Sequence, residues 1–256
     1  MSRGLRRFFV DQVFSEEGNL LQLSPHETFH LHRVLRLKEG DACLIFNRHG
    51  WKAEALVETI PEDEGARVRL KNIFPQRRRS LFIQAAQALP QKKKMDVLVE
   101  KAEELEIEKL WVMETKRTIV KMREEASERA RRRWERIVIE AAKQSGSPLL
   151  TEIEGPVPFE RLVKEKTNPS EPSFLFHPDP QGLPFSDLVE RLKRSGAEEA
   201  PESVFLFFGP EGGFTEGEVH LAESCGVQKV FLGGSTLRLE TAFLGVVSAI
   251  RFLIPN

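Results

Sequence analysis

The chain has 256 residues, a formal net charge of −1 and 40% hydrophobic residues. This length allows one large domain or two ordinary ones, and the balanced charge excludes a uniformly basic nucleic-acid binder while leaving room for local basic patches. Cys43 and Cys225 lie far apart without metal-ligand spacing, so we expect no disulfide framework, no metal site and a reducing, cytoplasmic location. The basic N-terminus lacks the apolar core of a signal peptide, and the longest apolar run, 242–250, is too short to span a bilayer.

Short strands are predicted over residues 1–72. The segments CLIFN, WKAEALVETI and ARVRLKNI are β-branched or alternating, and turn sequences separate them. A helical turn interrupts them around SPHETFHLHRVLR, with Ser24 as its cap and Pro25 as its first residue. We therefore expect a small β-barrel over 1–72, ending before the polar, basic segment FPQRRRS.

Strands and helices alternate from Leu81 onward. The apolar strand segments are LFIQAAQAL, KLWVMET, SFLFH, SVFLFFG and QKVFLGG, and the helical stripes lie in KKKMDVLVEKAEELEI and EEASERARRRWERIVIEAAKQSG. Continuous apolar strands are typical of parallel sheets that helices cover on both faces. This pattern predicts an α/β domain over 73–256.

The stretch FFGPEGGFTEGEV runs from the end of a core strand straight into a glycine-rich loop. Thr215 and Glu218 have the spacing of a capping box, so a helix begins directly after the loop. The loop thus follows the carboxyl end of a parallel strand, where open α/β sheets bind ligands, and we expect a positive φ at Gly212. It is neither a phosphate loop nor G-x-G-x-x-G. A tight turn without any ligand is the alternative.

A second glycine turn occurs one strand later, in FLGGSTLRLETA. Gly233 and Gly234 end the strand, and Arg238 precedes a helix that is apolar almost all round and therefore belongs to the core or to a subunit interface. Arg238 could be solvated or paired with Glu211 or Glu240. The two loops together predict a cleft lined by backbone groups, which suits a flat, polar-edged ligand such as adenine.

Basic residues occur in several short segments, and we expect most of their side chains to be exposed to solvent. The segments RGLRRFF (3–9) and HLHRVLRLK (30–38) differ because they lie in a strand-rich module and the first contains neighbouring phenylalanines, a composition that favours RNA contact. The RNA-binding candidates here are Arg6, Arg7, Phe8, His32, Arg33 and Arg36. No carboxylate spacing supports a metal at His30, His32 or His177.

The two glycine loops in this order resemble the paired cofactor-loop signatures of the RsmE family, the 16S ribosomal RNA (uracil-N3)-methyltransferases of the SPOUT superfamily. RRFFV, HLHRVLRLKEGD, KKKMDVLVEKAEEL and EAAKQSG are similar to other signatures of that family, so the resemblance covers nearly the whole chain. The chain departs from the family pattern where Glu106 replaces the usual glycine and Ser147 the usual arginine. Thr236 and Leu239 also differ from the common Ile-Leu-Arg-Thr-Glu-Thr-Ala.

The resemblance implies a SPOUT-type α/β fold, in which a trefoil-knotted parallel sheet with helices on both faces follows a small PUA-like β-barrel. It also implies a homodimer that packs partly through the C-terminal helix, small-subunit 16S ribosomal RNA as substrate, and S-adenosyl-L-methionine as cofactor. The implied cofactor contacts are Phe176, His177, Gly209, Pro210, Glu211, Gly212, Gly213, Leu232, Gly233, Leu237, Arg238 and Thr241. Lys93, Lys94 and Gln144 are further implied RNA contacts.

Methylation at uridine N3 requires loss of the N3 proton, which spreads negative charge over O2 and O4. Arg238 beside the cofactor loop is the expected stabiliser of that anion, and Glu211 or Glu240 could accept the proton. Phe8, Phe9 or Trp51 could stack on the nucleotide. The alternatives are a related SPOUT enzyme that modifies another position and a non-catalytic RNA-binding assembly factor, whereas the missing G-x-G-x-x-G disfavours a dehydrogenase.

Overall fold

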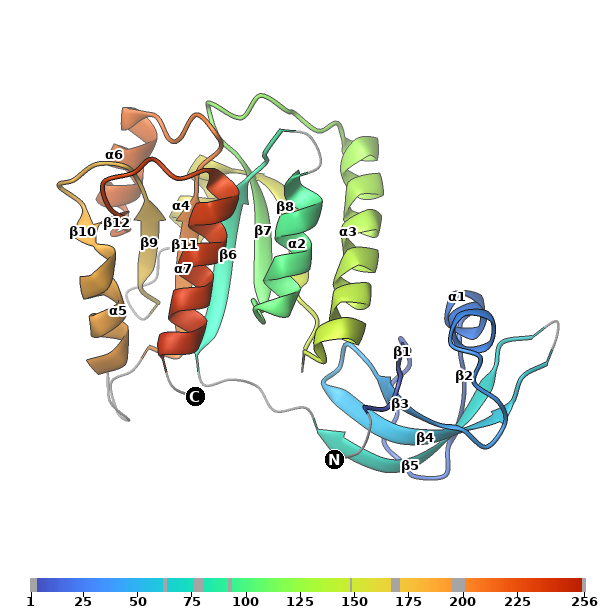
Figure 1. Cartoon of the computed structure of the whole chain (residues 1–256). Helices are drawn as coiled ribbons and strands as arrows, with labels where there is room; N and C mark the ends of the chain where they lie inside the picture. Colours follow the sequence, from blue (N-terminus) through green and yellow to red (C-terminus); the bar gives the residue numbers. More distant parts are fainter. Residues whose placement is uncertain are drawn as a thin grey trace. The chain divides into compact units, whose positions relative to one another are not determined.

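The computed structural model describes residues 4–61, 64–75, 81–91, 94–147, 149–166, 171–194 and 201–254. The chain forms two compact units. The first consists of Met1–Arg78 together with Ile139–Leu150, and the second of Arg79–Val138 together with Thr151–Asn256. Helix α3 (Glu124–Ser145) therefore begins in the second unit, and its last residues belong to the first (Figure 1).

A curled five-stranded sheet forms most of the first unit (Figure 1). Its strands, in the order β1-β3-β4-β5-β2, are β1 (Arg7–Phe9), β3 (Ala42–Phe46), β4 (Trp51–Thr59), β5 (Arg67–Pro75) and β2 (Leu20–Gln22). β1 runs parallel to β3 and the other pairs are antiparallel, with two register shifts between β4 and β5. Alternate side chains of β4, those of Ala53, Ala55 and Val57, are buried in the core of this unit.

Helix α1 (Pro25–Phe29) begins as the sequence predicts, because Ser24 Oγ accepts a hydrogen bond of 3.2 Å from the backbone N–H of Glu27. It continues without a break into the π-helical turn η1 (His30–Val34). Leu31 is fully buried and anchors this segment to the core of the first unit.

The second unit contains a seven-stranded sheet in which every adjacent pair is parallel. The strands, in the order β10-β12-β9-β11-β6-β7-β8, are β10 (Leu183–Pro184), β12 (Gln228–Phe231), β9 (Ser173–Phe176), β11 (Ser203–Phe208), β6 (Phe82–Ala88), β7 (Lys109–Glu114) and β8 (Glu152–Pro158). The predicted α/β fold is therefore confirmed. The sequence patterns missed β8, whose run EIEGPVP contains a glycine and two prolines and buries few side chains.

Helices cover both faces of this sheet, as predicted. Figure 1 shows α2 (Lys94–Glu104), α5 (Phe185–Arg194) and α7 (Leu239–Leu253) on one face and α4 (Phe159–Lys166) and α6 (Glu216–Ser224) on the other. No described helix is long and apolar enough to cross a membrane. The strand order is decisive for the site, because β12, β9 and β11 are neighbours and their carboxyl ends meet at one edge.

Candidate functional site

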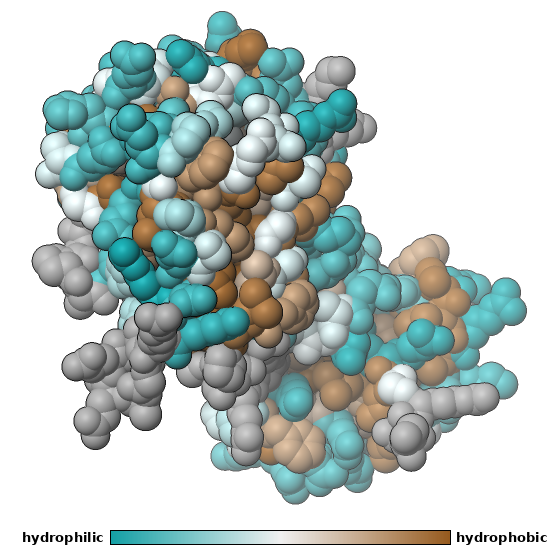
Figure 2. Space-filling view, turned by 60° about the vertical axis from the view of Figure 1, so that its left-hand side comes forward, coloured by the Kyte–Doolittle hydropathy of each residue, from teal (hydrophilic) through white to brown (hydrophobic). Residues whose placement is uncertain are grey.

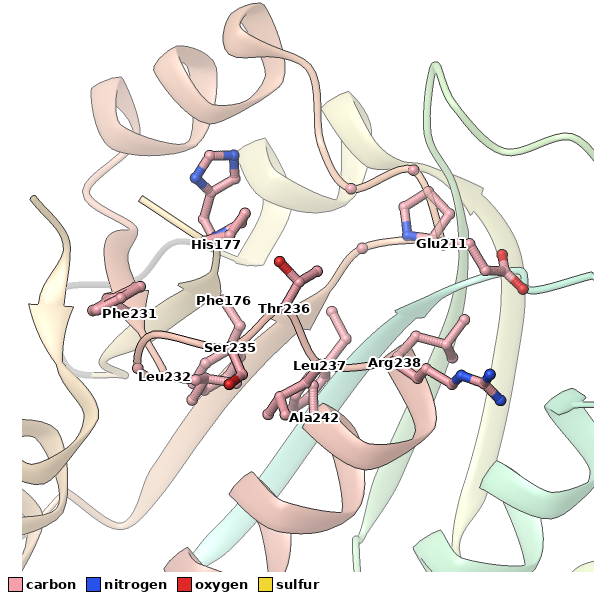
Figure 3. A pocket seen from close by; sticks show the side chains of 18 of the residues that line it. Phe176, His177, Glu211, Phe231, Leu232, Ser235, Thr236, Leu237, Arg238 and Ala242 are labelled. Atoms are coloured by element: carbon pink, nitrogen blue, oxygen red, sulfur yellow. The ribbon is translucent and has the colours of Figure 1, made fainter. Parts of the chain in front are cut away.

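The segments that follow β9, β11 and β12 enclose a cavity of about 490 Å³ in the second unit (Figure 3). Its lining contains every predicted cofactor contact except Thr241, namely Phe176, His177, Gly209, Pro210, Glu211, Gly212, Gly213, Leu232, Gly233, Leu237 and Arg238. Thr241 lies in the first turn of α7 and does not line the cavity. The sequence analysis missed Phe208, Phe231, Ser235, Thr236 and Ala242, which also line it.

The loop after β11 is shaped by its glycines and by the helix that follows. Gly209 packs so closely on Phe214 that an added Cβ would lie 3.1 Å from the ring. Gly213, rather than Gly212 as expected from the sequence, has a positive φ, of 67°. The predicted capping box of α6 is confirmed, since the backbone N–H of Thr215 donates to Glu218 Oε2 at 2.8 Å and Thr215 Oγ1 accepts from the backbone N–H of Glu218.

The loop after β12 brings Arg238 to the rim of the cavity. Gly233 has a φ of 123°, a conformation that favours glycine, and it turns the chain back along the cavity. Arg238 is the N-cap residue of α7, and its side chain makes no capping hydrogen bond. Ser235 and Thr236 are exposed on the same loop and add hydroxyl groups to the lining. In the sequence, only their position between the two glycines and Arg238 indicated that Ser235 and Thr236 line the cavity.

A charged cluster links this rim to α2. The ammonium Nζ of Lys94 lies 3.1 Å from Glu211 Oε1 and 3.1 Å from Glu240 Oε1. The hydrogen bonds that Lys94 donates to Glu211 and Glu240 raise the pKa of its ammonium. Burial opposes ionisation of Glu211, but hydrogen bonds from the backbone and from Lys94 outweigh it and leave the pKa of that carboxyl below its ordinary value. Within the described part of the chain, Arg238 makes no ion pair, so neither pairing considered for it from the sequence is present.

His177 offers an unused hydrogen-bonding group beside the cavity. Its backbone N–H donates to the carbonyl of Val230 at 3.0 Å, which fixes the residue at the end of β9. Its Nδ1 is buried and has no hydrogen-bond partner. Burial, and then the positive charge of Lys229, lower the pKa of the imidazole below its ordinary value. A buried, unpaired nitrogen of this kind gains most by bonding a ligand.

The structure corrects part of the predicted RNA-binding set. Phe8 is fully buried in the core of the first unit, because β1 pairs with β3 and turns this ring inward, so Phe8 is unavailable to stack on a base. Arg7 is used internally, since its Nη1 donates to the carbonyls of Lys143 and Gln144 at the end of α3, at 3.0 and 3.2 Å. Lys93 lies outside the described residues.

Arg6, His32, Arg33, Arg36 and the side chain of Gln144 are exposed in the first unit, and Lys94 lines the cavity of the second. The segment α1–η1 also exposes two apolar residues that the sequence analysis did not select, Phe29 at 61% and Val34 at 57%.

Acidic groups are absent from the exposed side of α1–η1. Glu27 is the sole acidic residue between Ser24 and Lys38, and it is buried. Its Oε1 lies 2.9 Å from the Nζ of Lys143, which is itself buried and also lies 2.9 Å from Glu140 Oε1. His26, Glu27 and Glu140 have donor atoms close enough to hold a metal ion, but the ammonium of Lys143 already lies between the two carboxylates.

Comparison with known proteins agrees with this geometry. The chain matches a family model described as an RNA methyltransferase domain over residues 77–251 and one described as an RNA methyltransferase PUA domain over residues 23–71. It is 30% identical to the ribosomal RNA small subunit methyltransferase E of Aquifex aeolicus, over 92% of this chain and 96% of that protein. The chain belongs to the RsmE family of RNA methyltransferases.

Two solved structures are similar over almost the whole chain. A protein described as a methyltransferase from Legionella pneumophila, solved in complex with the cofactor SAM, is 27% identical with a TM-score of 0.84, over 96% of this chain and 97% of that one. A ribosomal RNA small subunit methyltransferase E from Neisseria gonorrhoeae, bound to S-adenosyl methionine, is 25% identical with a TM-score of 0.81, over 98% of both chains.

The structure explains one departure from the RsmE pattern. Glu106 has a φ of 56°, directly after α2, and the backbone N–H of Ile107 donates to the carbonyl of Ala102 at 2.9 Å. This is the left-handed helix end that normally takes glycine, so the glycine usual in the RsmE family has a conformational reason. Ser147, in place of the usual arginine, is buried, and its hydroxyl donates to the carbonyl of Leu149 at 2.8 Å.

Proposed function

We propose that this RsmE-family chain transfers the methyl group of S-adenosylmethionine to N3 of a uridine in the 16S RNA of the small ribosomal subunit. The observation that carries the proposal is the cavity at the carboxyl ends of β9, β11 and β12, with the guanidinium of Arg238, which has no ion-pair partner among the described residues, at its rim. Such a cavity suits a small ligand of mixed polarity, and the guanidinium suits a substrate that becomes anionic.

The lining fits the cofactor. Phe176 and Phe208 stack on each other with ring centroids 4.8 Å apart and supply an apolar floor for an adenine ring. The glycine loops expose backbone N–H and C=O groups that can bond its polar edge, and His177 Nδ1 is a buried polar atom in need of a partner. When bound, S-adenosylmethionine would supply a methyl group that is already activated by the sulfonium.

Arg238 performs the central step of the proposed mechanism. Transfer of the N3 proton to Glu240, Glu211 or solvent water places negative charge on O2 and O4 of uracil, and a guanidinium held at the cavity rim stabilises this charge as it develops. Glu211 is a weaker base than the sequence suggested, because the hydrogen bonds that it accepts lower its proton affinity. Arg238, rather than either carboxylate, therefore carries the proposal.

In this proposal the first unit binds the RNA. The segment α1–η1 exposes the cation Arg33 and the aromatic ring of Phe29, Arg36 is exposed two residues after it, and the one acidic residue of the segment, Glu27, is buried. Cations attract phosphates and an exposed ring stacks on an unpaired base, which together favour single-stranded RNA.

We further propose a knotted, dimeric protein that works in the cytoplasm. β12 lies between β9 and β10, so the chain inserts a late strand between earlier ones, as a knot at this edge would require. Helix α7 exposes Phe252 at 73% and Leu253 at 49%, and Figure 2 shows apolar side chains reaching the surface of the second unit. A partner subunit would cover such a surface. Light scattering at micromolar concentration tests the dimer.

The decisive test of the reaction is transfer of labelled methyl groups to small ribosomal subunits from a strain that lacks the enzyme. We expect label in the 16S RNA, and nucleoside mapping should identify 3-methyluridine. Label in another nucleoside would favour a related enzyme that modifies a different position. Binding of the subunit without any transfer would favour a non-catalytic assembly factor.

A further inference from the structure

Arg238 has no ion-pair partner among the described residues, although the carboxylate of Glu211 lines the same cavity. Figure 3 shows the side chains of Glu211 and Arg238 extending toward the same side of the cavity. Glu240 lies two residues after Arg238, in the first turn of α7. An arginine normally pairs bidentately with a carboxylate within its reach, because the guanidinium fork matches the two oxygens. Both carboxylates contact a different cation instead.

Lys94 is the residue that holds them. It is the first residue of α2, and its single ammonium lies 3.1 Å from an oxygen of each glutamate. The backbone N–H of Gln91 adds a 3.2 Å hydrogen bond to the same oxygen of Glu211. The second oxygen of Glu240 is buried without a hydrogen-bond partner, so this carboxylate has capacity left for another cation. If Lys94 lost its charge, two other cations could neutralise the glutamates: Arg238, which lines the same cavity, and Arg117, whose Nη1 donates to the carbonyl of Gly212 at 2.7 Å.

We propose that Lys94 is a positioning residue that engages Glu211 and Glu240 and thereby leaves the guanidinium of Arg238 free for the substrate anion. The inference rests on the proposed function, since it gives a reason why Arg238 is available for the reaction. It differs from the sequence-based expectation for Lys94, which was direct contact with RNA.

The test compares single-turnover methyl transfer by the wild type and by three variants. Lys94→Met removes the charge, and we expect the rate to fall by about tenfold to a hundredfold, the range typical of strongly coupled neighbours. Lys94→Arg retains a cation and should recover most of the rate. The triple variant Lys94→Met, Glu211→Gln, Glu240→Gln removes the competing carboxylates as well, so it should be faster than Lys94→Met alone.

Lys101→Met is the matched control. Lys101 lies on the same helix and also bridges two glutamates, at 2.8 Å from Glu100 and 2.7 Å from Glu104, but it does not line the cavity. Its side chain is 32% exposed and that of Lys94 is 30% exposed, so the two substitutions are alike except in location. The control should keep the wild-type rate.

The outcomes separate this inference from the proposed function. If Arg238→Ala leaves the rate unchanged, the assigned role of Arg238 is wrong and the inference falls with it. If Arg238→Ala slows transfer but Lys94→Met does not, only the inference is overturned. A triple variant no faster than Lys94→Met, with reduced affinity for RNA in both, would make Lys94 an RNA contact and would also overturn it.

Discussion

Each of the two units contains a lysine whose ammonium bridges two glutamates, but the two clusters differ in burial. The side chain of Lys143 in the first unit is 3% exposed, and that of its partner Glu27 is 5% exposed. The side chain of Lys94 in the second unit is 30% exposed, and that of Glu211 is 31% exposed. A lysine that bridges two glutamates therefore lies in the interior of the first unit and at the rim of a cavity in the second.

This difference predicts different roles for the two lysines. Breaking a buried ion pair leaves an uncompensated charge in the interior, which is strongly destabilising. A half-exposed ion pair is screened by solvent and contributes little to stability. Such a pair matters mainly because it fixes the positions of the side chains that form it. We therefore expect Lys143 to act on folding and Lys94 on the rate of the reaction.

The largest effect on stability should come from Lys143→Met. We expect it to lower the free energy of unfolding of the first unit by about 3–5 kcal/mol, because Glu27 remains buried without its cation. Lys94→Met should change the stability of the second unit by less than about 1 kcal/mol. Hydrogen exchange of core amides in each unit measures both. Equal losses of stability in the two variants would contradict the different roles assigned to Lys143 and Lys94. Adding Glu27→Leu to Lys143→Met should restore the stability of the first unit, because it removes the unpaired buried carboxylate.

A glycine substitution tests whether the cavity rim, rather than the unit as a whole, governs cofactor binding. Gly213→Val places a branched side chain at a φ of 67° beside the cavity, and we expect about a hundredfold loss of affinity for S-adenosylmethionine. Gly226→Val imposes a similar strain, at a φ of 87°, but away from the cavity. Calorimetry should show nearly unchanged affinity in that control. Equal losses would show that strain alone is responsible.

In the first unit, Phe29→Ala should weaken binding of a single-stranded RNA oligonucleotide by about tenfold, since stacking of one base on an aromatic ring is worth about 1–3 kcal/mol. Phe74→Ala is the control, because Phe74 is a 40% exposed aromatic residue near the far end of β5. Fluorescence anisotropy measures both affinities. An equal loss in the two variants would remove Phe29 from the proposed RNA surface.

The smallest effect concerns the helix end at Glu106. Glu106→Gly should raise the free energy of unfolding of the second unit by about 1 kcal/mol, because glycine adopts a φ of 56° without the penalty of a side chain. It should leave the first unit unchanged. Glu100→Gly, inside α2, should instead lower the stability by about 1 kcal/mol. A loss of stability in Glu106→Gly would show that its side chain makes a compensating contact.

The sequence predicted most of what depends on local pattern. Five strands of the parallel sheet (β6, β7, β9, β11 and β12), the cap of α1, the capping box of α6 and both glycine loops follow from periodicity and from short-range hydrogen bonding. Strand β8 could not be foreseen, because its glycine and prolines hide the strand pattern. Phe8 was misassigned because an aromatic residue among arginines has the same local pattern whether it faces RNA or the core.

The charged clusters were beyond sequence reasoning for a different reason. Lys94 meets Glu211, and Lys143 meets Glu27, across more than a hundred positions in the chain in each case. No local sequence rule selects such partners, and the sequence alone does not distinguish which lysine pairs with each glutamate. Only the packing of α2 beside the loop after β11, and of the end of α3 beside α1, decides the pairs.

The central claim is that the free guanidinium of Arg238 stabilises the uridine anion beside the bound cofactor. Single-turnover methyl transfer by Arg238→Ala, measured at saturating S-adenosylmethionine and RNA, tests it most directly. We predict a rate lower by about two to three orders of magnitude, with RNA affinity reduced far less, because the interaction strengthens only as the proton leaves. A variant that keeps its single-turnover rate but binds RNA or cofactor poorly would contradict the claim.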